Sequence, residues 1–281
     1  MNRQDFDVVI TADDRGYRNV WKELWQYRNM VFQMIRRNFV ANYKQTVLGP
    51  SWAIIQPVVS TIITAVVFGG LAGLSPDGIP MFLFYMSGQL TWGFFSGCLN
   101  NVSTTFVSNA GLMGKVYFPR FAMPIVGAGT NVISLVIQAT MFTVFYIFFV
   151  FRGAEISLHW SAALIPLYLI QLAILGMGVG AVLSAMTTKY RDTTFLISYG
   201  VTFWMYLTPV VYDIGIVPKT YMWLYMINPV SPVITHIRYA LFQQGQLYWG
   251  YYFLSVGITI FFLIFGSRVF HKVERTFIDI V

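Results

Sequence analysis

The sequence predicts an all-α integral membrane protein with six transmembrane helices. Of its 281 residues, 57% are hydrophobic and only 10% are charged, and the mean hydropathy is +0.62. A water-soluble domain would carry roughly a quarter charged residues. Six stretches contain no charged residue, and each meets or closely approaches the ~20 residues that a helix needs to cross the hydrocarbon layer. These stretches are residues 50–73, 81–107, 121–151, 161–188, 193–212 and 250–267.

The basic residues indicate the orientation of these helices. A net charge of +7 fits a membrane protein whose Lys and Arg gather on cytoplasmic loops, and it requires no nucleic-acid partner. With the N-terminus inside, 15 of the 18 Lys and Arg lie on the cytoplasmic side, and only Arg152, Lys219 and Arg238 lie outside. The opposite orientation would invert this ratio. We therefore expect both termini in the cytoplasm.

Residues 1–49 form the expected cytoplasmic N-terminal region, ahead of a membrane domain at residues 50–281. Within this region, residues 17–29 place Trp21, Trp25 and other apolar side chains on one helical face and basic side chains on the other. Two tryptophans beside bases are typical of an amphipathic helix that lies in the membrane interface. We expect such an interface helix here.

Small residues at four-residue spacing predict close contacts between the membrane helices. Gly176, Gly180 and Ser184 follow this spacing in the fourth stretch, and Gly93 with Gly97 does so in the second. Small side chains let two helix backbones approach each other, so we expect tight packing at both places.

The segment between the fifth and sixth stretches, residues 213–249, breaks the pattern. Its apolar pieces are too short to cross a membrane, and Pro218, Pro229 and Pro232 separate them. Short broken helices occur at membrane depth only where protein or a watery cavity covers their backbone. We interpret the segment as a re-entrant external helical hairpin. A folded extracellular loop with aromatic anchors is the alternative.

The sequence shows neither an internal energy source nor a catalytic site. Ion-coupled carriers need ionisable groups within the membrane, and the six stretches have none. The string nearest to a phosphate-binding loop, residues 111–116, has the wrong glycine spacing and no hydroxyl after Lys115. His159, His236 and His271 are far apart in the sequence. We expect a transport subunit rather than an enzyme, without a cofactor of its own and energised by a partner.

Five short motifs appear in order along the six predicted spans. The string NYKQTVLGPSW occupies residues 42–52 and is followed by Gln56-Pro57. The other four are YFPR at 117–120, KYRD at 189–192, TPVVY at 208–212 and NPVSP at 228–232. Together they resemble the permease subunits of ABC-2 type polysaccharide exporters, which export O-antigen, capsule or teichoic acid. The pattern is most similar to that of O-antigen exporter permeases. An N-terminal extension of about two dozen residues, acidic in its first half, is missing from shorter family members.

The resemblance implies a partner and a substrate. It implies a homodimer in the bacterial cytoplasmic membrane, docked on two ATP-binding cassette subunits that bind MgATP. It also implies a continuous conduit for a lipid-linked polysaccharide. An ABC-2 exporter of teichoic acid, capsule or a small amphiphile is the alternative within the class, and a stand-alone membrane enzyme is the alternative outside it.

Two stripes of side chains are the candidate lining of this conduit, because the resemblance implies that spans one and five line it. In span one, polar groups and one aromatic ring recur every four residues at Trp52, Gln56, Ser60 and Thr64. In span five, an aromatic face is formed by Phe195, Tyr199, Phe203 and Tyr206. Helix packing or lipid contact is the alternative role for any one of these side chains.

The resemblance also implies an external gate and a surface that couples to the ATPase. The gate would be the hairpin after span five, with Tyr212, Trp223, Tyr225, Asn228 and Pro229. The coupling surface would combine the interface helix with the cytoplasmic loop at residues 108–120. Its candidate residues are Trp21, Trp25, Leu112, Lys115, Tyr117, Phe118 and Arg120.

Overall fold

The structure is a computed structural model that describes residues 24–277 except 75, 77, 114–121 and 191. Every regular element among these residues is helical. The first helix that lies wholly within the described residues is α2 (Arg28–Tyr43), and it is followed by the short η1 (Gly49–Ser51), α3 (Trp52–Thr64) and the π-helical turns η2 (Ala65–Leu71). There follow α4 (Met81–Ser103), α5 (Thr105–Met113), α6 (Ala122–Phe151), η3 (Trp160–Leu164), α7 (Ile165–Lys189) and α8 (Thr193–Tyr206). The chain continues through η4 (Ile214–Ile216), α9 (Met222–Ile227), α10 (Val230–Phe242) and α11 (Trp249–Phe277).

A helix lies at each of the six charge-free stretches, which confirms the all-α membrane fold. Within the part of the chain that the structure describes, four helical segments are long and apolar enough to cross a membrane: Gly49–Leu71, Ala122–Phe151, Trp160–Lys189 and Trp249–Val273. The other two stretches form α4, which has several polar residues along its 23, and α8, which has 14 residues. The number of six crossings therefore stays a prediction.

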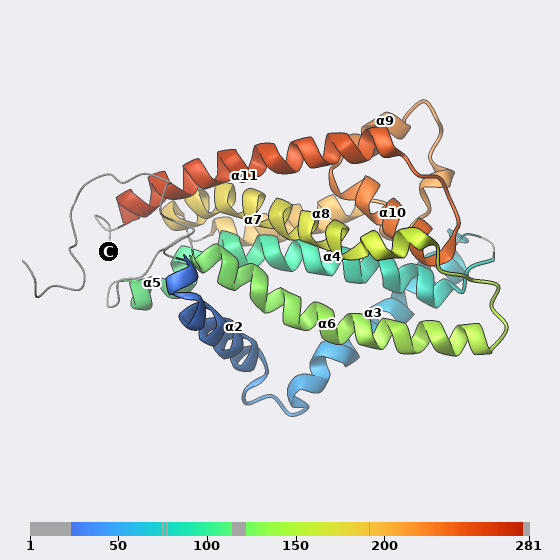
Figure 1. Ribbon diagram of the computed structural model, residues 1–281, viewed down its shortest axis with the longest axis horizontal. Helices are drawn as coiled ribbons and strands as arrows, with labels where there is room; N and C mark the ends of the chain where they lie inside the picture. The colour runs from blue at the N-terminus through green and yellow to red at the C-terminus, as the bar shows by residue number, and fades with distance from the viewer. Residues whose placement is uncertain (1–23, 75, 77, 114–121, 191, 278–281) are drawn as a thin grey trace, which may run out of the picture.

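Helix α7 is the centre of the bundle, and it packs against α4 on one side and α11 on the other (Figure 1). On the α4 side, a Cβ at Gly180 would lie 2.7 Å from the Leu99 carbonyl oxygen. On the α11 side, Gly178 meets the backbone of Phe262 and of Gly266. Glycine is required at these crossings because any side chain would force the helices apart. The predicted close packing is thus confirmed for the α7 glycines.

The hairpin after α8 returns into the bundle, as its proline-broken pattern predicts. Its apolar pieces form η4, α9 and α10, and eleven of the 13 residues of α10 are buried. Helix α10 contacts α4, α7, α11 and η3, and the Tyr146 hydroxyl donates a hydrogen bond to the Leu241 carbonyl at 2.9 Å. Because protein covers the backbone of α10, the hairpin satisfies the condition for a broken helix at membrane depth.

The end of the bundle that is expected in the cytoplasm differs in two ways from the simplest expectation. The predicted interface helix at 17–29 falls mostly outside the described residues, whereas α2, which follows it, packs against α6. Of the loop expected at 108–120, residues 108–113 are helical, because α5 continues the helical path of α4 to Met113 after a single turn residue, Thr104; the rest of that loop lies outside the described residues. The start of α2 and the end of α11 lie at the same end of the molecule (Figure 1).

Candidate functional site

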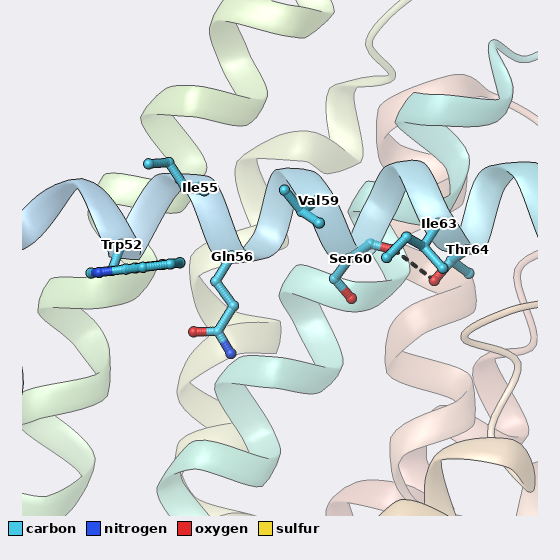
Figure 2. Close-up of a pocket in the computed structure, with 7 residues that line it drawn as sticks. All are labelled: Trp52, Ile55, Gln56, Val59, Ser60, Ile63 and Thr64. Carbon is cyan, nitrogen blue, oxygen red and sulfur yellow. Dashed lines mark hydrogen bonds between the residues drawn. The ribbon is translucent and has the colours of Figure 1, made fainter. Parts of the chain in front are cut away.

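The polar stripe predicted in the first span lies along one side of α3. Figure 2 shows Trp52, Gln56 and Ser60 pointing to the same side of the helix, with Ile55 pointing away. A hollow of about 340 Å³ follows this stripe. Residues of α3 alone line the hollow, so it is an open groove and not an enclosed cavity: Trp52, Ile55, Gln56, Val59, Ser60, Ile63 and Thr64.

A glutamine of α4 ties the stripe to the bundle. The Ser60 hydroxyl donates to Gln89 Oε1 at 2.8 Å, and Gln89 Nε2 donates to the Thr64 hydroxyl at 2.5 Å. The Thr64 hydroxyl in turn donates to the Ser60 carbonyl at 2.8 Å, the bond drawn in Figure 2. Each polar group in this triad has a partner, so the outer half of the stripe is held in a fixed arrangement.

Gln89 begins a strip of accessible residues on α4, which sequence analysis missed. Gln89, Gly93, Ser96 and Asn100 follow one another at helical spacing, and all remain accessible while most of α4 is buried. A Cβ at Gly93 would meet no atom within 4 Å. Small and polar residues occur all around span two. Their spacing in the sequence therefore does not show which of them lie on the accessible strip and which on the packed faces.

The aromatic stripe of the fifth span lies on the outward side of α8. Phe195, Tyr199, Phe203 and Tyr206 are all exposed. The opposite side of α8 is anchored on α4, where Trp204 packs edge-on against Trp92 at 6.1 Å and Phe95 at 5.2 Å between ring centroids.

Helices α3 and α8 both pack on α4, so the two predicted stripes and the α4 strip belong to one group of three helices. We call this group of residues the conduit surface. It comprises Trp52, Gln56, Ser60 and Thr64 of α3, Gln89, Gly93, Ser96 and Asn100 of α4, and Phe195, Tyr199, Phe203 and Tyr206 of α8.

Asn228 and Pro229 join the hairpin to two helices, α8 and α11. The indole of Trp204 donates to Asn228 Oδ1 at 3.0 Å, and Asn228 Nδ2 donates to the Thr208 hydroxyl at 2.7 Å. The Pro229 carbonyl accepts from the Ser255 hydroxyl of α11 at 2.5 Å. These two candidate gate residues therefore connect α8, the hairpin and α11 through hydrogen bonds.

The aromatic gate candidates lie before this turn, in the segment after α8 and in α9. Tyr212 and Tyr225 pack edge to face with 6.1 Å between their ring centroids. Trp223 of α9 is 53% exposed.

Arg238, one of the three bases expected on the external side, is buried in the bundle. It lies on α10 and is only 7% exposed. Its guanidinium donates to the carbonyl oxygens of Pro209 at 2.7 Å, Val210 at 2.6 Å and Tyr212 at 3.1 Å, and it lies 3.7 Å from the ring centroid of Phe84. These carbonyls belong to the TPVVY segment, which leaves the helical path after α8 and needs hydrogen-bond donors.

The predicted coupling residues are described only in part. Trp25 is exposed and precedes α2, and Leu112 lies in the last turn of α5. Trp21, Lys115, Tyr117, Phe118 and Arg120 lie outside the described residues.

Comparisons with known proteins agree with the motifs. The family model described as ABC-2 type transporter matches residues 29–242. Two proteins from Klebsiella pneumoniae, each named O-antigen export system permease protein RfbA, are 25% and 28% identical to the chain, over 90% of it and 95% of their own length. A protein of the same name from Myxococcus xanthus is 23% identical over 80% of the chain and 85% of its own length. The chain is therefore a member of the ABC-2 type transporter family.

Proposed function

We propose that the chain is the permease subunit of an ATP-driven exporter that moves a lipid-linked, O-antigen-like polysaccharide across the bacterial cytoplasmic membrane. The observation that carries the proposal is the conduit surface: α3 and α8, which carry the two predicted stripes, both pack on α4, which carries the accessible polar strip. The similarity to three permeases named for O-antigen export supports the substrate class.

The chemistry of the conduit surface suits a sugar polymer. Amide and hydroxyl groups of Gln56, Ser96 and Asn100 can exchange hydrogen bonds with sugar hydroxyls. The rings of Tyr199 and Phe203 offer flat faces against which the C–H groups of a sugar can pack. Each such contact is weak and is repeated along the helices, so a chain can advance without leaving a deep binding site.

Homodimerisation would complete the conduit. Polar groups facing lipid are unfavourable because hydrocarbon cannot replace their hydrogen bonds with water. A second copy placed against the conduit surface would cover the α4 strip and enclose a polar path between the two subunits. ATP-binding cassette subunits carrying MgATP would bind at the end that holds α5 and the start of α2, where the predicted coupling residues lie in the sequence.

We further propose that both termini lie in the cytoplasm. The start of α2 and the end of α11 share one end of the molecule (Figure 1), which supports two cytoplasmic termini. The sequence distribution of Lys and Arg, with 15 of 18 on the expected cytoplasmic side, agrees with the positive-inside rule.

Reconstitution tests the function directly. Proteoliposomes that contain the permease and its ATPase should move a lipid-linked glycan only when ATP is hydrolysed. Movement by the permease alone, or full movement with a catalytically inactive ATPase, would contradict the proposal. Movement of small amphiphiles but not of the glycan would favour the alternative ABC-2 exporter.

A further inference from the structure

His236 of α10 is enclosed by aromatic rings from two other helices. Its side chain is fully buried. The imidazole stacks on the ring of Tyr252 of α11, with 5.0 Å between the ring centroids. It meets Tyr168 of α7 and Trp249 of α11 edge to face, at 5.7 Å and 5.1 Å between centroids. Through these contacts His236 docks α10 on both α7 and α11.

The two imidazole nitrogens of His236 differ in their surroundings. Nδ1 lies 3.4 Å from the Tyr168 hydroxyl, whereas Nε2 is buried without a hydrogen-bond partner among the described residues. A neutral imidazole has one N–H donor, but an imidazolium has two donors and a positive charge. A protonated His236 in this position would hold a charged N–H at Nε2 with no acceptor, which is costly away from water.

The helices around His236 provide no negative charge for an imidazolium. The sequences of α4, α7, α9, α10 and η3 contain no Asp or Glu. The charged residues of α7 and α11 lie at the opposite ends of these helices, at Lys189 and from Arg268 onward. The only charged residue of α10 itself is Arg238, a second cation. The only acid of residues 213–249 is Asp213, whose charge acts on Arg238 and Tyr248 but not on His236.

The titratable groups that face His236 are phenols, on Tyr168 and Tyr252, and phenols are uncharged near neutral pH. The other titratable side chains of the surrounding elements pack elsewhere: Tyr85 on Phe84, Tyr146 on Phe242, Tyr225 on Tyr212, His159 on Tyr239, Tyr248 on Tyr251, and Cys98 beside Gly176. The docked arrangement of α10 therefore suits a neutral imidazole and disfavours a protonated one.

Water lies one side chain away from this buried imidazole. Trp249, which forms one wall of the aromatic enclosure, is the first residue of α11 and is 39% exposed. A displacement of this ring would admit water and protons to His236. The residue is thus buried but close to the solvent, as a residue that responds to pH must be.

We propose that His236 is a pH sensor that keeps α10 docked in the bundle while it is neutral and releases α10 when acid protonates it. An imidazole in water takes up a proton near pH 6.5, whereas the docked site resists protonation. Docking is therefore fully stabilised above about pH 6.5 and loses stability as the pH falls below it. At pH 5 the undocked form should gain about 30-fold over the docked form. This inference does not depend on which substrate is exported.

Hydrogen–deuterium exchange of α10 tests the sensor in the full-length permease. The protein is labelled in lipid nanodiscs at pD 7.5 and pD 5.0, and the rates are corrected for the intrinsic pH dependence of amide exchange. The protection of peptides from residues 230–242 should fall by about 30-fold at pD 5.0. Peptides from the middle of α7 should keep their protection. If the protection of α10 is the same at both pD values, the proposal is overturned.

Variants show whether His236 is the group that titrates. His236→Phe keeps a ring to stack on Tyr252 but binds no proton, so its α10 should lose no protection at pD 5.0. His236→Gln is a second variant without a titrating group and should behave in the same way. The matched control is His159→Gln, which removes the other histidine that contacts α10 and should retain the full acid response. An acid response that persists in both His236 variants, or that disappears in His159→Gln, overturns the proposal.

Discussion

Arg238 shows what a single residue can add to a fold that is otherwise apparent from hydropathy. Its place in the external hairpin follows from the sequence, but its burial does not. The partners of its guanidinium are the carbonyls of Pro209, Val210 and Tyr212. Every residue has a backbone carbonyl whatever its side chain, so sequence analysis could not identify these three as the partners of Arg238. The cation provides donors for carbonyls that the end of α8 leaves without helical partners.

Replacing Arg238 should therefore destabilise the outer end of the bundle. Arg238→Met leaves several buried carbonyls without donors, and we expect a loss of about 2–4 kcal/mol in the free energy of unfolding. The stability of Arg238→Lys should lie between that of the unchanged protein and that of Arg238→Met, because one ammonium cannot reproduce the fork of the guanidinium. Thermal unfolding of the detergent-solubilised protein measures the effect. The exposed Arg152→Met is the control, and an equal loss in both variants would refute the assignment.

Gly88 tests the same contact from the side of α4. A Cβ at Gly88 would lie 2.6 Å from Arg238 Nη2 and 2.6 Å from the Val210 carbonyl oxygen, so Gly88→Ala must displace one of them. We expect a loss of about 1–3 kcal/mol in thermal unfolding experiments. Gly93→Ala, one turn further along the helix, adds its methyl group to open space and should be nearly neutral or slightly stabilising. If both variants lose equal stability, the close approach of Arg238 to α4 is not real.

At the scale of elements, the charge-free stretches and the proline-bounded pieces of the hairpin were predictable, because length and composition alone decide them. The faces of those elements were less predictable. Gly97 packs against Asn131 of α6 as expected for a small residue, but its predicted companion Gly93 faces open space. Spacing shows that two glycines share a face, whereas only the tertiary arrangement shows whether a neighbouring helix covers it.

The open position of Gly93 allows the conduit surface to be blocked without disturbing the bundle. Gly93→Leu places an apolar side chain in the middle of the α4 strip, and we expect export to fall by roughly ten-fold or more through steric obstruction. Gly257→Leu on α11 is the matched control, because its Cβ would likewise meet no atom within 4 Å. Glycan transport in proteoliposomes is measured at equal amounts of protein. Equal transport by the two variants would show that the polymer does not pass along α4.

At the scale of the whole molecule, one bundle combines a closed side with an open one. Helix α7 lies tightly between α4 and α11 at glycine crossings, whereas α3 and α8 present exposed side chains beside the accessible strip of α4. Both stripes could be located from sequence because their periodicity is strong. Their shared contact with α4 depends on packing between helices far apart in the chain, which periodicity does not encode.

An open face of this kind predicts where a second copy lies. In a Cys98→Ala background, Ser96→Cys on the α4 strip should form a covalent dimer with a bifunctional maleimide, since the two copies would face each other across a narrow polar path. Gly257→Cys on α11 should stay largely monomeric under the same conditions. Gel electrophoresis after reaction in native membranes measures the dimer fraction, and addition of a lipid-linked glycan should lower it for Ser96→Cys by occupying the path. If Gly257→Cys forms the dimer and Ser96→Cys does not, the copies meet through α11, and the conduit surface faces lipid instead of a partner.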